Sequence, residues 1–166
     1  MQKIIKDGGL VVDGASIVHP TSEEPWPPRH DGFCFITWPQ WLRAYPAFAG
    51  FYTKPGVWID GSDDIDGFES HLTEVPAIAI HFNRFADGTG FSTGALLREK
   101  YGFEGELRAF GELIADQALQ LRRCGFNTIV LKEGESLETA LSMLVGAGLT
   151  YQGSVYSPRT PFKFRF

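Results

Sequence analysis

The sequence contains few of the residues that build metal centres, clusters or disulfide frameworks. Only two of its 166 residues are cysteines, Cys34 and Cys124, and they lie too far apart for a CxxC pair or a zinc-ligand spacing. Two separated cysteines cannot hold an iron–sulfur cluster, and no haem, flavin or nicotinamide motif is present. We therefore expect no metal and no bound cofactor, and we interpret both cysteines as small buried hydrophobic residues.

Long apolar runs and an excess of positive charge are also missing. No stretch approaches the roughly 20 apolar residues of a membrane helix, and residues 1–7 lack the apolar core of a signal peptide. Acidic residues outnumber basic ones by 20 to 15, and the net charge of −5 argues against nucleic acid or an acidic membrane as a partner. A reduced, cytoplasmic protein is the simplest interpretation.

The composition is that of a folded domain, with 43% hydrophobic and 14% aromatic residues. Its length fits a single domain over residues 1–166. Within that domain we predict four segments: an N-terminal β-hairpin (1–18), a proline-rich loop (19–32), repeated strand–helix units (33–156) and a tail (157–166).

Short apolar runs alternate with helical patterns, which predicts an α/β fold with a mostly parallel sheet. The pattern leaves open whether the sheet forms an open three-layer sandwich or a partial barrel. Gly102, Gly125 and Gly148 recur every 23 residues, where each ends a helix as a left-handed cap. Strands are predicted at 33–37, 56–60, 77–82, 106–111, 127–133 and 149–156. The first predicted helix begins at Pro39 and is ended by Pro46. Further helices are predicted over 62–72, from Ser92 or Thr93 onward, over 112–124, and after an N-cap at Ser136.

Ligands of parallel sheets and barrels bind beyond the carboxyl ends of the strands. That rule selects a small set of candidates, among which His81 is either an acid or base or a hydrogen-bonded structural residue. The strand-end candidates are Thr37, Trp38, Asp60, His81 to Arg84, Glu112, Lys132 and Glu133.

A glycine-rich loop, "FADGTGFSTGALLREKYGF" (85–103), precedes one predicted helix. Asp87, Gly88, Gly90 and Ser92 form either an anion cradle or a tight turn. The glycine spacing differs from the dinucleotide fingerprint, and the ending of a P-loop is missing. Glu112 follows Gly90 by 22 residues (112 − 90), close to the offset of a ribose-binding acid, but it also fits the start of its own helix.

Arg108 lies inside a strand whose two faces should both be covered, so its guanidinium needs a partner. We expect either a structural ion pair with Asp116 or Glu112, or a bound anion.

The segment from Ile78 to Glu133 resembles a bacterial family named domain of unknown function 934. The matching stretches include "DGTGFS", "LLREKYGF", "GELRAFGE" and "LRRCGF". The residues that match the family signature, and that are candidates for an anion site, are Asp87, Gly88, Gly90, Ser92, Arg98, Arg108, Asp116 and Arg123.

Three positions depart from that signature. Thr89 and Ala115 stand where the family has arginine, and Glu112 stands where it has aspartate. If those arginines bind an anion in the family, this chain has lost two of them.

The resemblance implies a function in sulfur assimilation, because members are encoded near assimilatory sulfite reductase and are often labelled as oxidoreductases. We therefore expect an accessory protein with sulfite reductase or another sulfur-assimilation enzyme as partner, while a homo-oligomer remains open. The alternative is a small α/β enzyme or binding module for an anionic metabolite that uses the loop from Asp87 to Ser92. The resemblance assigns no catalytic residue.

Overall fold

The computed structural model describes residues 2–19, 32–48, 53–85 and 88–146. Most of the proline-rich loop, the predicted strand 149–156, Gly148, Asp87 and the tail lie outside the described residues. The strands are β1 (Lys3–Lys6), β2 (Gly9–Val12), β3 (Ser16–Ile17), β4 (Cys34–Thr37), β5 (Gly56–Asp60), β6 (Ala77–Phe82), β7 (Glu106–Gly111) and β8 (Thr128–Ile129). The helices are α1 (Trp38–Phe48), α2 (Thr89–Glu99), α3 (Ala118–Arg123) and α4 (Leu137–Val145), with short 3-10 turns η1 (Phe68–Ser70) and η2 (Ala115–Gln117).

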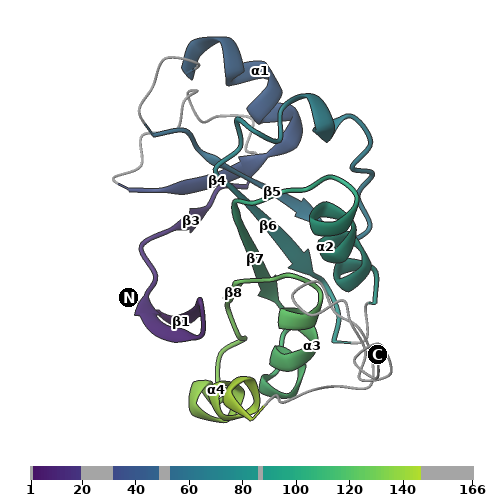
Figure 1. Cartoon of the computed structure of the whole chain (residues 1–166). Coiled ribbons are helices and arrows are strands. Elements are labelled where there is room, and N and C mark those ends of the chain that lie inside the picture. The colour runs from purple at the N-terminus through teal and green to yellow at the C-terminus, as the bar shows by residue number, and fades with distance from the viewer. Residues whose placement is uncertain (1, 20–31, 49–52, 86–87, 147–166) are drawn as a thin grey trace, which may run out of the picture.

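All eight described strands form one mixed sheet in the order β2-β1-β8-β7-β6-β5-β4-β3 (Figure 1). Strands β3 to β8 follow one another in chain order, and each pairs with the next in parallel. Strand β1 is antiparallel to both of its neighbours, β2 and β8. The α/β class and the N-terminal hairpin are therefore confirmed, and the mostly parallel sheet carries one reversed strand.

The hairpin turns at Asp7 and Gly8, which both have positive φ, at 50° and 80°. A two-residue turn of this kind matches the right-handed twist of the paired strands. Lys6 then pairs with Gly9 at the start of the register.

The sheet is strongly curled into a half-barrel. Strands β2 and β3 lie at opposite ends of the sheet, yet only residues 13–15 separate them in the chain. That link reaches roughly 14 Å, whereas eight strands laid flat at about 4.8 Å spacing would span roughly 34 Å. The short link therefore requires the curl and excludes the open sandwich.

The strands present alternate side chains to two separate apolar clusters. The larger core lies between the helices and the outer face of the sheet, and includes Ile36, Val57, Ile78, Ile80 and Leu107. The inner face holds a smaller cluster of Phe35, Ala77 and Ala79, with Trp58 and Phe110 packed against it. The inner face of the curl is therefore lined by aromatic side chains.

Helix α2 begins three residues before the predicted start, at Thr89, because its glycines are used for packing. A Cβ on Gly90 would lie 2.6 Å from the ring of Phe82, and one on Gly94 would lie 2.4 Å from the ring of Phe126. Both glycines are buried on the side of α2 that faces the sheet. They let the helix approach the sheet closely, and this explains two of the four glycines between residues 85 and 103.

Four predicted boundaries were wrong for local reasons. Pro46 lies inside α1, which continues to Phe48. The predicted helix over 62–72 is reduced to η1, because Gly67 before it adopts a left-handed φ of 93°. The predicted helix over 112–124 is split into η2 and α3, and β8 is only two residues long. Gly102 and Gly125 have the expected positive φ, and Ser136 caps α4 through Thr139 N–H.

We expect Gly94→Ala to lower the free energy of unfolding by about 1–3 kcal/mol, because the new methyl group would overlap the buried Phe126 ring. Urea denaturation measures the change. Gly14→Ala is the control, since a Cβ there meets nothing within 4 Å, and we expect a change within about 0.5 kcal/mol. Equal stability of the two variants would contradict the packing role of Gly94.

Candidate functional site

Two of the strand-end candidates meet at the carboxyl edge of the sheet. Asp60 ends β5 and His81 lies opposite it on β6, in register. The Nδ1 atom of His81 lies 2.9 Å from Oδ1 of Asp60, and the Nδ2 group of Asn83 donates to the same oxygen over 2.9 Å. Asp60 therefore receives two hydrogen bonds that fix its carboxylate and, through it, the imidazole.

The hydrogen bond sets the tautomer of His81. An ionised carboxylate can only accept, so Nδ1 carries the proton and Nε2 is left as a basic nitrogen. Among the described residues Nε2 has no hydrogen-bond partner, and the side chain is 29% exposed. The ring stacks on Phe110 with centroids 4.8 Å apart and meets Trp58 edge-on at 6.3 Å. This arrangement is a fixed imidazole that can accept or return a proton.

The surroundings of this pair are acidic. Between Pro55 and Asn83 the chain has no lysine or arginine, but it has the acids Asp60, Asp63, Asp64, Asp66, Glu69 and Glu74. Glu74 pairs with Lys54 before the amino ends of β5 and β6, and Asp66, which accepts from the hydroxyl of Tyr101, lies near the ammonium of Lys100. Asp60, Asp63 and Asp64 make the end of β5 acidic, while Arg84 follows β6 at the same edge of the sheet.

The remaining strand-end candidates do not join this pair. Arg84 and Asp116 are exposed at the surface. Glu112 follows β7 and lies 3.8 Å from Lys132 in an exposed ion pair. These residues occupy the same edge of the sheet without forming one cluster.

The glycine-rich loop gives little support to an anion cradle. Gly88 is the N-cap of α2 and makes no side-chain capping bond, Ser92 is exposed, and Asp87 is outside the described residues. Thr93 donates its hydroxyl to the carbonyl of Gly61, which ties the helix to the end of β5. The loop is thus anchored to the sheet at the positions that the structure describes.

Two of the family-signature arginines have different surroundings. Arg98 donates to the carbonyl oxygens of Gly125, Phe103 and Gly105, so it holds together the loops that follow two helices. Arg123 lies in the last turn of α3, where its Nε is buried without a hydrogen-bond partner among the described residues. Arg98 is therefore explained by structure.

Arg108 is buried on the inner face and belongs to a charged cluster. Its Nη1 donates to Asp13 over 2.8 Å, its Nε donates to Glu106 over 3.0 Å, and its guanidinium lies over the ring of Phe35. Glu106 is also bound by Lys6 at 2.7 Å. The expected ion pair exists, but its partners are Asp13 and Glu106. Asp116 and Glu112 were the wrong partners, because both lie beyond the end of β7 at the opposite edge.

The cluster shifts the ionisation of Glu106. Burial opposes its charge, but the hydrogen bonds and charges of Lys6 and Arg108 outweigh burial and lower the pKa of Glu106. This stabilisation is fully present above the pKa of the unfolded chain, and it is lost as the pH falls through the lower pKa of the folded state.

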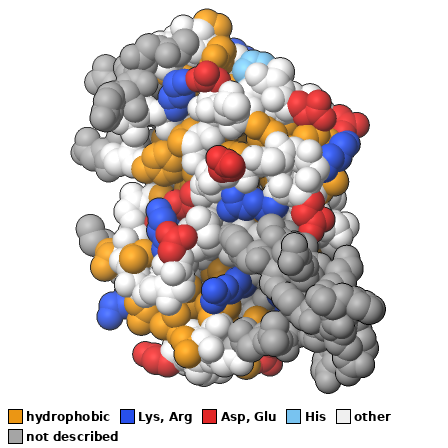
Figure 2. All heavy atoms as spheres, viewed as in Figure 1, with side chains coloured by type: hydrophobic (Ala, Val, Ile, Leu, Met, Phe, Trp, Pro, Cys, Tyr) orange, Lys and Arg blue, Asp and Glu red, His pale blue; other side chains and the backbone are white. Residues whose placement is uncertain are grey.

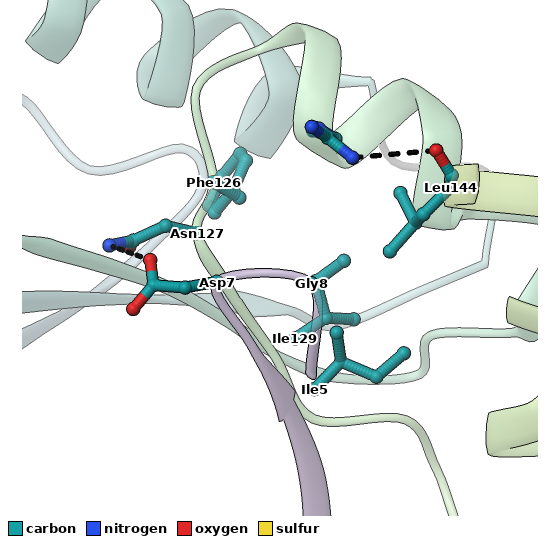
Figure 3. A pocket seen from close by; sticks show the side chains of 8 residues that line it. Ile5, Asp7, Gly8, Phe126, Asn127, Ile129 and Leu144 are labelled. Carbon is teal, nitrogen blue, oxygen red and sulfur yellow. Dashed lines mark hydrogen bonds between the residues drawn. The ribbon is translucent and has the colours of Figure 1, made fainter. Parts of the chain in front are cut away.

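Two hollows lie away from the carboxyl edge. One, of about 280 Å³, lies between the hairpin turn, α3 and α4, with a floor of Ile5, Phe126 and Ile129 (Figure 3). Asp7 and Asn127 bond to each other at its rim. The other, of about 450 Å³, is lined by the Arg108 cluster and by apolar residues of the hairpin. The charges around this second hollow already neutralise one another, whereas Arg122 at the first hollow donates to the carbonyl of Leu144 and has no ion pair among the described residues.

The cysteines lie apart and half-buried, and burial raises the pKa of both thiols. Within the described ranges no group of three or more His, Cys, Asp or Glu could hold a metal ion. In the same ranges no helix combines the length and apolar character needed to cross a membrane.

Sequence reasoning missed Asp13 and Glu106 as partners of Arg108, and it did not single out Phe110. A period of two was the available signal, because Glu106, Arg108 and Phe110 alternate along β7 and so share a face. No local pattern could have placed Asp13, which is 95 residues away from Arg108.

The fold and site define a half-barrel α/β protein with a histidine–aspartate pair at the carboxyl edge of its strands. A comparison with known families matches residues 56–162 to the family described as "Bacterial protein of unknown function (DUF934)". This match covers more than half of the chain, and the chain belongs to that family. The searches of curated proteins and of solved structures found no match.

Replacing Arg108 by methionine should lower the free energy of unfolding by about 3–5 kcal/mol, because it leaves the carboxylate of Asp13 buried without a cation and leaves Glu106 with Lys6 alone. Chemical denaturation at neutral pH measures the loss. The matched control is Lys132→Met, which removes an exposed pair and should change stability by less than about 0.5 kcal/mol. An Arg108→Met protein as stable as the control would contradict the structural role.

Proposed function

We propose that this protein is an accessory protein of assimilatory sulfite reduction that works beside a redox partner. Its working surface is the carboxyl edge around His81. The resemblance of its signature residues to proteins encoded near sulfite reductase supports the pathway. The pairing of His81 with Asp60, whose carboxylate also accepts from Asn83, supports the location, because it fixes an imidazole that can transfer a proton at the edge where α/β proteins act.

The chemistry of sulfite reduction gives such a group a task. Reducing an oxyanion to sulfide removes its oxygen atoms as water, and every oxygen that leaves consumes protons. When Nε2 of His81 is protonated, the ring becomes an imidazolium that Asp60 stabilises. Nε2 can then deliver its proton to a leaving oxygen.

The acidic surroundings favour an accessory role over direct binding of the substrate. Sulfite is an anion, and the carboxylates of Asp60, Asp63 and Asp64 at the end of β5 disfavour its capture beside His81. The partner would hold the sulfite, and this protein would present His81 to it.

Growth of a deletion strain tests the proposal. We expect slow growth with sulfate as the sole sulfur source, normal growth with sulfide, and rescue by the wild-type gene. His81→Gln should fail to rescue, because glutamine cannot shuttle a proton. The control is His71→Gln, whose imidazole is bonded to Ser70 and packs against aromatic rings of α1, and which should not be needed. Normal growth and normal sulfite reductase activity of the deletion strain would refute the proposal.

The second candidate is an enzyme or binding module for a small metabolite. The half-exposed, stacked ring of His81 favours it. Because of the local charge, we expect sulfite and sugar phosphates to leave the thermal midpoint of unfolding unchanged, as measured by a thermal-shift screen that also includes nucleotides and flavins.

The same thermal-shift screen also distinguishes the two candidate ligand sites, which are the loop before α2 and the carboxyl edge of the sheet. An upward shift that Ser92→Ala removes would assign an anion site to the loop before α2, whereas a shift that His81→Gln removes would assign it to the carboxyl edge. Either shift would favour the metabolite over the accessory role.

A further inference from the structure

Strand β2 is the end strand of the sheet, and its side chains are unusually apolar for an exposed edge. All four of its residues are exposed, and Leu10, Val11 and Val12 are 43%, 38% and 56% exposed. These three consecutive residues are prominent among the exposed large hydrophobic residues of the described chain. Figure 2 shows apolar side chains gathered at the end of the molecule where Figure 1 labels β1 and α4.

Within the part of the chain that the structure describes, the edge also lacks the usual protection against strand pairing. Natural edge strands are blunted by lysine, proline, a bulge or a covering element. Residues 8–12 read Gly-Gly-Leu-Val-Val, with no charge and no proline. No β-bulge interrupts the register of β2 with β1.

The register shows which backbone groups are available. In an antiparallel pair, residues alternate between bonding to the partner strand and pointing away from it. The N–H of Asp13 donates to the carbonyl of Gln2, so the backbone groups of Asp13 point towards β1 and its extension. Because the direction alternates along β2, the backbone groups of Leu10 and Val12 point away from β1. Their N–H and C=O groups form a template for one more strand.

We propose that this template binds the β2 strand of a second copy of the chain, in an antiparallel arrangement around a two-fold axis beside Val11. Leu10 then bonds to Val12 of the partner subunit, and Val12 bonds to Leu10 of the partner subunit. The two Val11 residues face each other as a non-bonded pair. Every outward backbone group of Leu10 and Val12 gains a partner, so the strand is complementary to itself.

Charge and length favour this pairing over other occupants. In the two-fold register Asp13 lies opposite Gly9 of the partner subunit, so no like charges meet across the interface. The other end of the sheet, β3, has only two residues, both half-buried. A head-to-tail contact between β2 and β3 therefore has little strand to use, whereas β2 with β2 is matched in length.

Sedimentation equilibrium over a range of concentrations tests the dimer. For the wild-type protein we expect the mass to rise from 18.4 kDa towards twice that value. Val11→Lys should keep the protein monomeric, because it opposes two ammonium groups at the axis. The control is Val145→Lys, at a valine of α4 that is 84% exposed, and it should dimerise like the wild type.

Cysteine cross-linking tests the register and does not depend on Val11→Lys folding. Residues in a non-bonded antiparallel pair have Cα atoms about 4.5 Å apart, a distance that a disulfide spans. Val11→Cys should therefore form a covalent dimer on mild oxidation. Val12→Cys faces Leu10 of the partner subunit and should not, and neither should the wild type, whose own cysteines are half-buried.

Three results would overturn the proposal. These are a wild-type protein that stays monomeric at all concentrations, a dimer that Val11→Lys leaves intact, and equal cross-linking of Val11→Cys and Val12→Cys. A wild-type protein that stays monomeric would overturn the proposed dimer even if β2 bound a strand from another protein. None of these measurements depends on the proposed role in sulfite reduction.

Discussion

The ion pair between Arg108 and Asp13 connects the two parts of the sheet that the chain must bring together. Asp13 begins the short link between the end strands β2 and β3, and Arg108 stands in the middle of the sheet on β7. The pair therefore ties the link to the inner face of the curl. The ring of Phe35 on β4 lies against the same guanidinium, so strands from both halves of the sheet meet at one side chain. Because this charge is buried, its carboxylate partners are required for the fold.

The inner face divides into a charged end and an aromatic end. Lys6, Glu106, Arg108 and Asp13 neutralise one another towards the amino ends of β6 and β7. Trp58, Phe110 and His81 occupy the carboxyl end, where the imidazole is held but still exposed. In barrel-like folds the amino end commonly serves stability and the carboxyl end serves chemistry. The role that we propose for His81 would give this half-barrel the same division.

The sequence predicted elements better than it predicted their partners. The bounds of β5, β6 and β7 match the prediction. For β6 the reason is its continuous apolar run, which identifies a strand buried on both faces. Asp60 and His81 were found as strand ends by the same logic. The curl could not be found, because it follows from which strands become neighbours and from the placement of β1 beside β8. The glycines of the 85–103 loop were misjudged for a similar reason, since Phe82 and Phe126 that they accommodate belong to other elements.

The N-terminal position of the hairpin also means that it is synthesised well before the strand with which it pairs. Asp7 and Asn127 are bonded partners separated by 120 residues, so the ribosome makes the hairpin long before the strand beside which it must lie. At about 5–20 residues per second this delay is roughly 6–24 s. During that interval the apolar residues Ile4 and Ile5, buried in the finished protein, have no β8 to pair with. The nascent chain therefore carries a strand edge open to chaperones or to other chains until the last parallel strand emerges.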